Sequence, residues 1–227
     1  MIRLHIIVEG RSEEGFVHST LRDHLGTFGI STDARRVLTG RDRRSGTKHK
    51  GGLINWAHAK NDILSWIRED DHNDCRFTTM FDLYGLPDDF PGYRAAHAGA
   101  APYQRVKMLE QEMADAIDDR RFIPYIQLHE FEALVFADPQ KLLMEYPRRG
   151  SSIQALVKTV GDLAPELIDE NPETAPSKRI LSHIPEYGKA RSGPSVTSLI
   201  GLPTLRRKCP HFDEWVTRLE EAGRGRI

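Results

Sequence analysis

The chain has 227 residues, of which 39% are hydrophobic and 29% are charged, and its formal net charge is −1. This length fits one α/β domain, alone or with a sizeable appendage, and the balanced charge does not indicate nucleic-acid binding by the chain as a whole. The apolar stretches are far shorter than the roughly 20 residues of a membrane helix, and Arg3 and His5 interrupt the first one too early for a signal peptide. We therefore expect a cytoplasmic location and no membrane partner.

Strand and helix patterns alternate through residues 1 to 138. Apolar runs predict strands at 2 to 8, 33 to 39, 76 to 82 and 121 to 136, the last running into a helical start. Amphipathic spacing predicts helices at 12 to 29, 53 to 70 and 102 to 119, with Pro102 near a first turn. Four strands separated by three helices predict an α/β fold with a four-stranded parallel sheet flanked by helices.

The pattern changes after residue 138. Short helical pieces alternate with prolines, among them Pro147, Pro165, Pro176 and Pro194, and strand signals are weak. We therefore predict two parts: an α/β domain at 1 to 138, and a helical C-terminal appendage at 139 to 227 that packs on it.

Acidic residues stand at the ends of the predicted strands. Glu9 falls at the end of the first predicted strand, Asp82 at the end of the third, and Glu130 and Glu132 at the end of the fourth. The carboxyl ends of parallel strands lie on one edge of a sheet, so these acids should meet there, and a cation or a shared proton would relieve their mutual repulsion. Such carboxylate oxygens are natural ligands for Mg²⁺ or Mn²⁺. Glu130 and Glu132 would share a face on a strand but diverge by about 200° on a helix.

Two other kinds of site are excluded by spacing. The stretch "GRDRRSGTKHK" lacks the order of glycines and lysine that makes a phosphate-binding P-loop. Cys75 and Cys209 form no CxxC pair, so we expect two reduced thiols and neither a disulfide nor a structural zinc site.

Basic residues gather in two regions. Residues 34 to 50 hold seven Lys or Arg against one acid, and residues 178 to 227 hold ten against five. Such regions suit a phosphate backbone, although a solvated surface has the same composition. The candidate nucleic-acid contacts are Arg41, Arg43, Arg44, Lys48, Arg179 and Lys189.

The motif "VEGRSEEGF" at 8 to 16 resembles the VEGxTE motif that opens the Toprim domains of OLD-type nucleases. The segments "MFDLYGLPDDFPG" and "YIQLHEFEALVF" are similar to an uncharacterised bacterial Toprim-like family, a domain of unknown function that is suspected in phage defence. The resemblance extends over the whole chain, through "PSKRI" and "YGKARSG" to "CPHFDEWVTRLE".

The resemblance implies a four-stranded parallel sheet that binds magnesium and cuts or joins phosphodiester bonds. Glu9 would be a metal ligand or general acid/base, and Glu13 the second acid of its motif. Asp82 would be the first acid of a DxD pair, and Glu130 or Glu132 a further ligand or a base that orients water.

One position departs from the family pattern. The second acid of the DxD pair would stand at position 84, where this chain has Tyr84. Asp88 or Asp89 could replace it only if the loop folds back. The departure weakens the case for a second metal ion.

Three further candidates have two interpretations each. His129 could be a catalytic general acid, or it could end the strand through a backbone hydrogen bond. Lys178, as a catalytic residue, and Arg179 could reach the substrate phosphate and stabilise developing charge, or they could be a solvated helix start.

The sequence thus predicts a Mg²⁺- or Mn²⁺-dependent nuclease of Toprim type that acts on nucleic acid, with DNA expected rather than RNA. By analogy with OLD-type nucleases, in which an ATPase is fused, we expect a separately encoded ATPase partner. One alternative is a non-catalytic subunit that binds nucleic acid or the ATPase. Another is a phosphoesterase for a small substrate.

Overall fold

The computed structural model describes residues 1–37, 53–168 and 174–225. Its sheet has the strand order β2-β1-β3-β4, with β5 also paired to β3, and all pairings are parallel. The strands are β1 (Ile2–Val8), β2 (Ile30–Arg36), β3 (Cys75–Asp82), β4 (Phe122–Ile123) and β5 (Ile126–Gln127). The predicted α/β fold with a parallel sheet is confirmed. Arg41, Arg43, Arg44 and Lys48 lie outside the described residues.

The last predicted strand is much shorter than expected. Residues 121 to 136 form β4 and β5, two residues each, and then the 3-10 helix η3 (Phe131–Ala137). Pro124 separates the two strands, because proline has no N–H to donate to the sheet. After β5 the backbone of His129 takes φ 61, a left-handed conformation that few residues other than glycine adopt. The strand part of this segment is therefore shorter and interrupted, and the predicted helical start follows it as η3.

The helices before residue 118 follow the predicted spacing. They are α1 (Arg11–Phe16), the π-helical segment η1 (Val17–Leu21), α2 (Arg22–Gly26), α3 (Trp56–Glu69), η2 (Leu83–Gly85, 3-10), α4 (Tyr93–Ala96) and α5 (Pro102–Ile117). The first predicted helix thus contains a π-helical interruption and ends three residues early. Strand β2 also begins earlier than predicted, since Ile30 pairs with Ile2.

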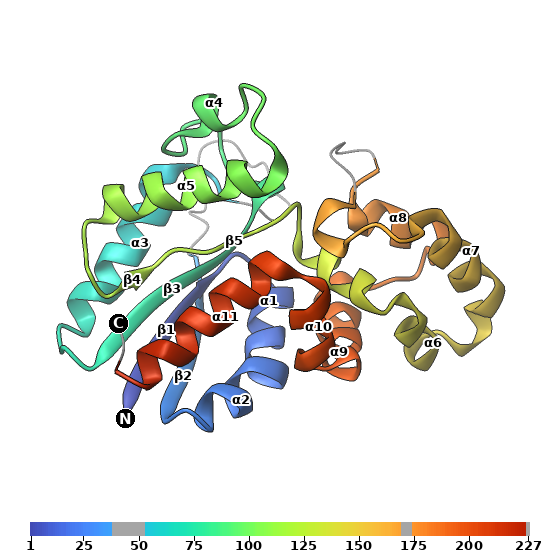
Figure 1. Ribbon diagram of the computed structural model, residues 1–227, viewed down its shortest axis with the longest axis horizontal. Coiled ribbons are helices and arrows are strands. Elements are labelled where there is room, and N and C mark those ends of the chain that lie inside the picture. The colour runs from blue at the N-terminus through green and yellow to red at the C-terminus, as the bar shows by residue number, and fades with distance from the viewer. Residues whose placement is uncertain (38–52, 169–173, 226–227) are drawn as a thin grey trace, which may run out of the picture.

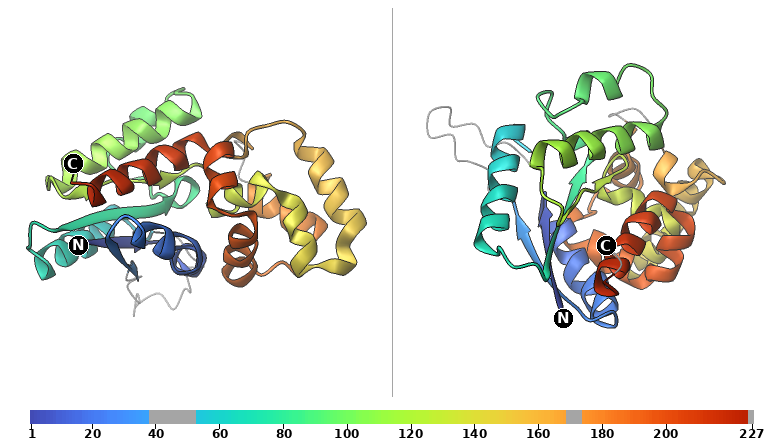
Figure 2. Two further views of the ribbon diagram at one scale, coloured as in Figure 1. Left: turned by 60° about the horizontal axis from the view of Figure 1, so that its bottom comes forward. Right: turned by 60° about the vertical axis from the view of Figure 1, so that its left-hand side comes forward.

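Two layers of helices cover the sheet (Figures 1 and 2). On one face, α3 and α5 pack on Ile7, Phe77 and Phe81. On the other face, α1, α2 and the C-terminal helix α11 (Pro210–Gly223) pack on Leu4 and Ile6. Alternating residues of β1 therefore pack into two different cores, because successive side chains of a strand point to opposite faces of the sheet.

The segment after residue 138 is helical, and the described part of it contains no strand. Its elements are η4 (Pro139–Lys141), α6 (Leu142–Glu145), η5 (Pro147–Arg149), α7 (Gly150–Val160), η6 (Pro165–Leu167), α8 (Pro176–His183), α9 (Lys189–Ile200), α10 (Leu202–Lys208) and α11. Pro147, Pro165 and Pro176 separate helical pieces by standing at the start of a new helix, but Pro194 lies inside α9 and does not break it. Each helix in the described ranges is too short or too polar to span a membrane.

The C-terminal helix α11 completes the core of the sheet. The indole of Trp215 stacks on Tyr125 at 4.2 Å between ring centroids, and its Nε1 donates a hydrogen bond to Thr78 Oγ1 at 2.9 Å. One buried cluster runs from β1 through η3 to α9 and α11. The core is therefore continuous across residue 138, and the division of the chain into two domains stays a prediction.

Candidate functional site

A pocket of about 330 Å³ lies at the carboxyl edge of the sheet. Val8 pairs with Arg36 and Met80, so the residues that follow β1 and β3 emerge side by side. The pocket is lined by Glu9, Gly10, Ser12, Glu13, Asp82, Tyr84, Gly85, Glu130, Glu132 and Lys189. The five acids that the sequence indicated thus meet in one place, together with a lysine from the first position of α9.

Glu9 and Glu13 each accept a backbone hydrogen bond, Glu9 from the end of β3 and Glu13 from its own motif. The Asp82 N–H donates to Glu9 Oε2 at 3.1 Å, which ties the end of β1 to the end of β3. The Gly10 N–H donates to Glu13 Oε2 at 2.8 Å, in the first turn of α1. The helix dipole also favours negative charge at that turn.

Glu130 is bound by two elements of the C-terminal segment. Its carboxylate accepts hydrogen bonds from the Ser177 N–H and from Ser177 Oγ, the latter at 3.0 Å, in the first turn of α8. The Lys189 ammonium lies 3.1 Å from Glu130 Oε2 and 3.7 Å from Glu132 Oε2. The segment after residue 138 therefore contributes directly to the pocket.

Two carboxylate oxygens in the pocket are buried without a hydrogen-bond partner among the described residues: Asp82 Oδ1 and Glu132 Oε1. Glu132 is only 2% exposed. A buried acceptor that lacks a partner is costly, typically about 1 to 3 kcal/mol, unless a proton or a cation compensates.

The acids also titrate abnormally. Burial, followed by the charge of Glu13, raises the pKa of Glu9 to about 7. Burial raises the pKa of Glu132 to about 8 although Lys189 opposes the change, and burial also raises the pKa of Glu13. The pKa of Asp82 lies well above its ordinary value, through burial and then through the charges of Glu13 and Glu9. Without a cation, the pocket therefore retains protons near neutral pH.

The donor set fits a hard divalent cation in its chemistry. Carboxylate oxygens are the ligands that Mg²⁺ and Mn²⁺ prefer, and the two buried acceptors without partners are positions that a cation could contact. Within the described ranges, however, no group of three or more His, Cys, Asp or Glu side chains forms a finished metal site. Side chains of the pocket would have to reorient to hold a cation, since Lys189 draws two of the carboxylates toward itself.

Several candidates from the sequence lie away from the pocket lining. His129 is buried beside Tyr84, with ring centroids 5.2 Å apart, and does not line the pocket. Lys178 is exposed on α8, and the Arg179 Nε donates to the Thr174 carbonyl. Their predicted catalytic and nucleic-acid roles stay predictions.

The loop after Asp82 brings no second acid to the pocket. Asp89 Oδ1 accepts a hydrogen bond from the Trp56 N–H at 3.0 Å, at the start of α3, and Asp88 is exposed. Neither residue lines the pocket.

Sequence reasoning missed three contributors: Ser12, Ser177 and Gly85. Ser12 stands inside the VEGRSE motif, and its place could have been inferred from Glu13 beside it. Ser177 follows Pro176, a typical helix start, but nothing in the local pattern links that helix start to Glu130.

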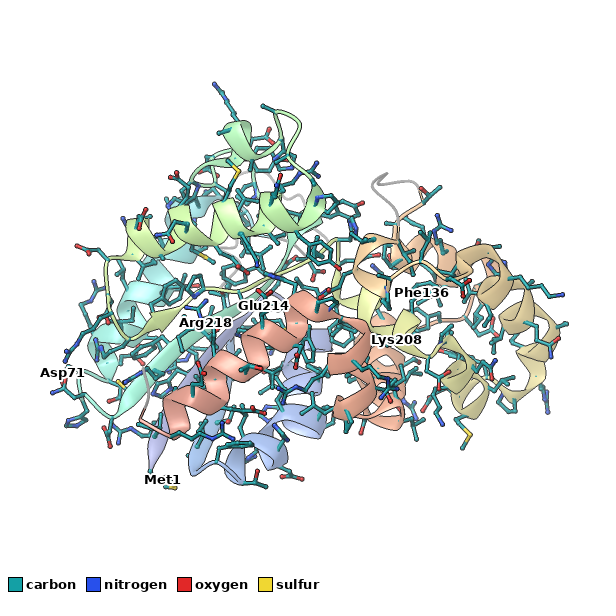
Figure 3. All side chains as sticks on the ribbon, viewed as in Figure 1. Met1, Asp71, Phe136, Lys208, Glu214 and Arg218 are labelled. Atoms are coloured by element: carbon teal, nitrogen blue, oxygen red, sulfur yellow. The ribbon has the colours of Figure 1, made fainter. Side chains whose placement is uncertain are left out.

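A larger hollow of about 580 Å³ lies elsewhere, between α7, η6 and α10. Phe136 and Lys208, labelled in Figure 3, are among its lining residues. Its basic groups, Arg207 and Lys208, are exposed surface side chains, and no cluster of buried ionisable groups lines it. The smaller acidic pocket is therefore the candidate site.

The fold and the site define the class: a three-layer α/β protein with an acidic pocket at the carboxyl edge of a parallel sheet. The model of the DUF4276 family, a domain of unknown function, matches residues 8–220, and the chain belongs to this family. No curated protein matches the chain.

Among solved structures, the chain is similar to the C-terminal region of the OLD protein of Xanthomonas campestris pv. campestris. The structure phased with iodine is 16% identical, with a TM-score of 0.47, over 99% of this chain and 97% of that chain. The structure phased with mercury is 15% identical, with a TM-score of 0.41, over 96% of this chain and 98% of that chain.

Proposed function

We propose that the acidic pocket binds Mg²⁺ or Mn²⁺ and hydrolyses phosphodiester bonds in nucleic acid, as a nuclease of Toprim type. The observation that carries the proposal is the convergence of five carboxylates and one lysine from four separate parts of the chain on one pocket. Like charges at such a site need a cation, and a phosphate ester is a substrate on which a carboxylate-held cation and an ammonium group can act together. The resemblance of the VEGRSE motif to Toprim domains of OLD-type nucleases supports the same function.

Asp82 and Glu132 would hold the cation, with Glu9 and Glu13 beside them, because each of the first two has a buried oxygen without a partner. When bound, such a cation lowers the pKa of water and neutralises charge on a phosphoryl oxygen. Glu9, which lines the same pocket, can accept a proton from the attacking water. The Lys189 ammonium can contact a non-bridging phosphate oxygen.

The experiment is cleavage of single-stranded and duplex DNA and of RNA with Mg²⁺ or Mn²⁺, compared with EDTA. Glu132→Gln should reduce cleavage by at least about 10²-fold, in the range found when one catalytic group is lost. Glu14→Gln is the matched control: Glu14 neighbours Glu13 on α1, but it pairs with Arg36 at 3.1 Å and does not line the pocket. Equal cleavage by wild type and Glu132→Gln would refute a catalytic role for this pocket.

A second function is favoured by specific features. Tyr84 stands where a second metal-binding acid is expected, and Lys189 already neutralises part of the cluster. A subunit that binds nucleic acid or a separately encoded ATPase without cleaving would have such a site. It predicts DNA binding that survives Glu132→Gln, with no cleavage by either protein. An ATPase partner and a role in phage defence are proposed from the family resemblance. Recovery of an ATPase together with the protein from its native host would test the proposed ATPase partner.

The small-substrate alternative has its own signature. Hydrolysis of bis(p-nitrophenyl) phosphate without any cleavage of DNA or RNA would favour a phosphoesterase over a nuclease.

A further inference from the structure

We infer that the pocket takes a single divalent cation, and that the Lys189 ammonium supplies the positive charge that a second cation would otherwise provide. The inference rests on the proposed function for the presence of a cation. It goes further by assigning the number of ions and separate roles to Glu130 and Glu132.

Glu130 is committed to protein contacts. Its two oxygens accept from the Ser177 N–H, from Ser177 Oγ and from the Lys189 ammonium. A carboxylate has about four acceptor positions, so these three donors occupy most of them. Glu130 is therefore a clamp that joins the starts of α8 and α9 to the sheet edge, and it positions Lys189.

The two oxygens of Glu132 have different surroundings. Its Oε2 lies 3.7 Å from the Lys189 ammonium, whereas its buried Oε1 has no hydrogen-bond partner. The other pocket oxygen without a partner belongs to Asp82. The unsatisfied acceptors therefore come from Glu132 and Asp82, and those around Lys189 are already neutralised.

A second cation has few uncommitted ligands in the described part of the pocket. Tyr84 offers a neutral phenol in place of a carboxylate, and its backbone N–H is bound to the His129 carbonyl at 2.9 Å. Asp89 is used at the start of α3. Glu130 is also committed, and one oxygen each of Glu9 and Glu13 accepts a backbone N–H. Asp82 and Glu132 are left with buried oxygens that have no partner, and two carboxylates are the usual number for one Mg²⁺ or Mn²⁺ ion.

Lys189 is held in place by tight helix packing. A β-carbon on Gly15 of α1 would lie 2.9 Å from Pro194 Cγ of α9, so only a glycine allows α9 to approach this closely. The start of α9 is thus fixed beside the pocket, where the Lys189 ammonium contacts Glu130 and Glu132.

The test is the number of Mn²⁺ ions bound by the full chain, from calorimetric titration and from the electron paramagnetic resonance signal of free Mn²⁺. The expected value is one for the wild type. Lys189→Met removes the built-in positive charge, so Mn²⁺ affinity should rise by about tenfold or more, with or without a second ion. Lys107→Met is the control, because Lys107 forms an exposed ion pair with Glu214 and neither residue lines the pocket.

Lys189→Arg covers the case in which Lys189→Met does not fold, since it keeps the charge and should keep one ion at close to wild-type affinity. Two ions in the wild type would overturn the inference, and so would unchanged or weaker Mn²⁺ binding by folded Lys189→Met. The cleavage assay separates this result from the proposed function. One bound ion without cleavage would support the single-cation inference and contradict the nuclease proposal. Two bound ions with cleavage would contradict the inference and support the nuclease. Absence of any bound ion would overturn both the inference and the proposed function.

Discussion

The carboxylate of Glu9 lies directly against Gly85. A β-carbon on Gly85 would stand 2.6 Å from both oxygens of Glu9, closer than non-bonded atoms approach. The absence of a side chain at position 85 therefore lets the short η2 turn pack on the carboxylate that ends the first motif. This relationship joins two segments more than 70 residues apart, and it leads to the first prediction.

Gly85→Ala should displace the Glu9 carboxylate while the fold survives. The obstructed atoms are the far end of a flexible side chain, so we expect a change in stability of less than about 1 kcal/mol. Mn²⁺ affinity should nevertheless fall. Gly26→Ala is the control, because a β-carbon there meets nothing within 4 Å. Thermal unfolding and Mn²⁺ titration measure the two effects, and wild-type Mn²⁺ affinity in Gly85→Ala would show that the position of Glu9 does not matter for the cation.

Glu9→Gln should have opposite effects without and with a cation. Removing one charge from the carboxylate cluster relieves repulsion, so the metal-free protein should become more stable. The stabilisation by Mn²⁺ should shrink, and cleavage should fall by about 10² to 10⁴-fold. Melting temperatures with EDTA and with Mn²⁺ provide the measurement. Full cleavage with an unaltered Mn²⁺ response would rule out a functional role for Glu9.

The stability of the metal-free protein should fall as pH rises from about 4.5 to about 8. Glu9 and Glu132 have raised pKa values of about 7 and about 8, so the folded state binds more protons than the unfolded state in this window. Their contribution is fully present below the unfolded pKa and is lost as pH rises through the folded pKa, at about 1.4 kcal/mol per pKa unit.

Denaturant unfolding at several pH values would test this dependence. His211 also has a raised pKa, through Glu110 and despite burial, and contributes a slope of the same sign. The comparison is therefore between wild type and Glu132→Gln, which should have the shallower slope. Identical slopes in the two proteins would mean that Glu132 does not titrate in this range.

Removal of residues 139 to 227 should yield insoluble protein. The truncation uncovers the face of the sheet on which Trp215 stacks against Tyr125, and it removes Ser177 and Lys189 from the pocket. Solubility and binding of a hydrophobic dye measure the exposed apolar surface. A fragment of residues 1 to 138 that unfolds cooperatively would show instead that the C-terminal segment is an independent module.

Changing Arg41, Arg43 and Arg44 to Gln should weaken nucleic-acid binding and flatten its dependence on salt, because fewer counterions are released. These residues lie outside the described part of the chain, so the prediction rests on composition. Binding isotherms at several salt concentrations provide the test. If affinity at low salt stays the same, this stretch does not contact the phosphate backbone.

Much of the fold follows from local pattern. The apolar period of residues 2 to 8 and of α3 and α5 identifies the elements, and their alternation implies the parallel sheet that the structure has. The shared edge of such a sheet is a property of topology, so Glu9 and Asp82 could be placed together from the sequence. The length of the last strand was overestimated because its apolar residues continue past Pro124 and His129, where the backbone ends the pairing.

The partners of the carboxylates could be decided only by tertiary packing. Glu130 meets Ser177 and Lys189 because α9 packs closely on α1 and because one core runs from the sheet into the C-terminal helices. These contacts span about 50 residues or more and leave no period in the sequence. The sequence by itself determined which acids end the strands, since burial and alternation are local. Long-range packing decided which acid binds Lys189 and which acid keeps an oxygen without a donor. The packing of distant segments sets the distances between these groups, and electrostatic interactions depend on those distances.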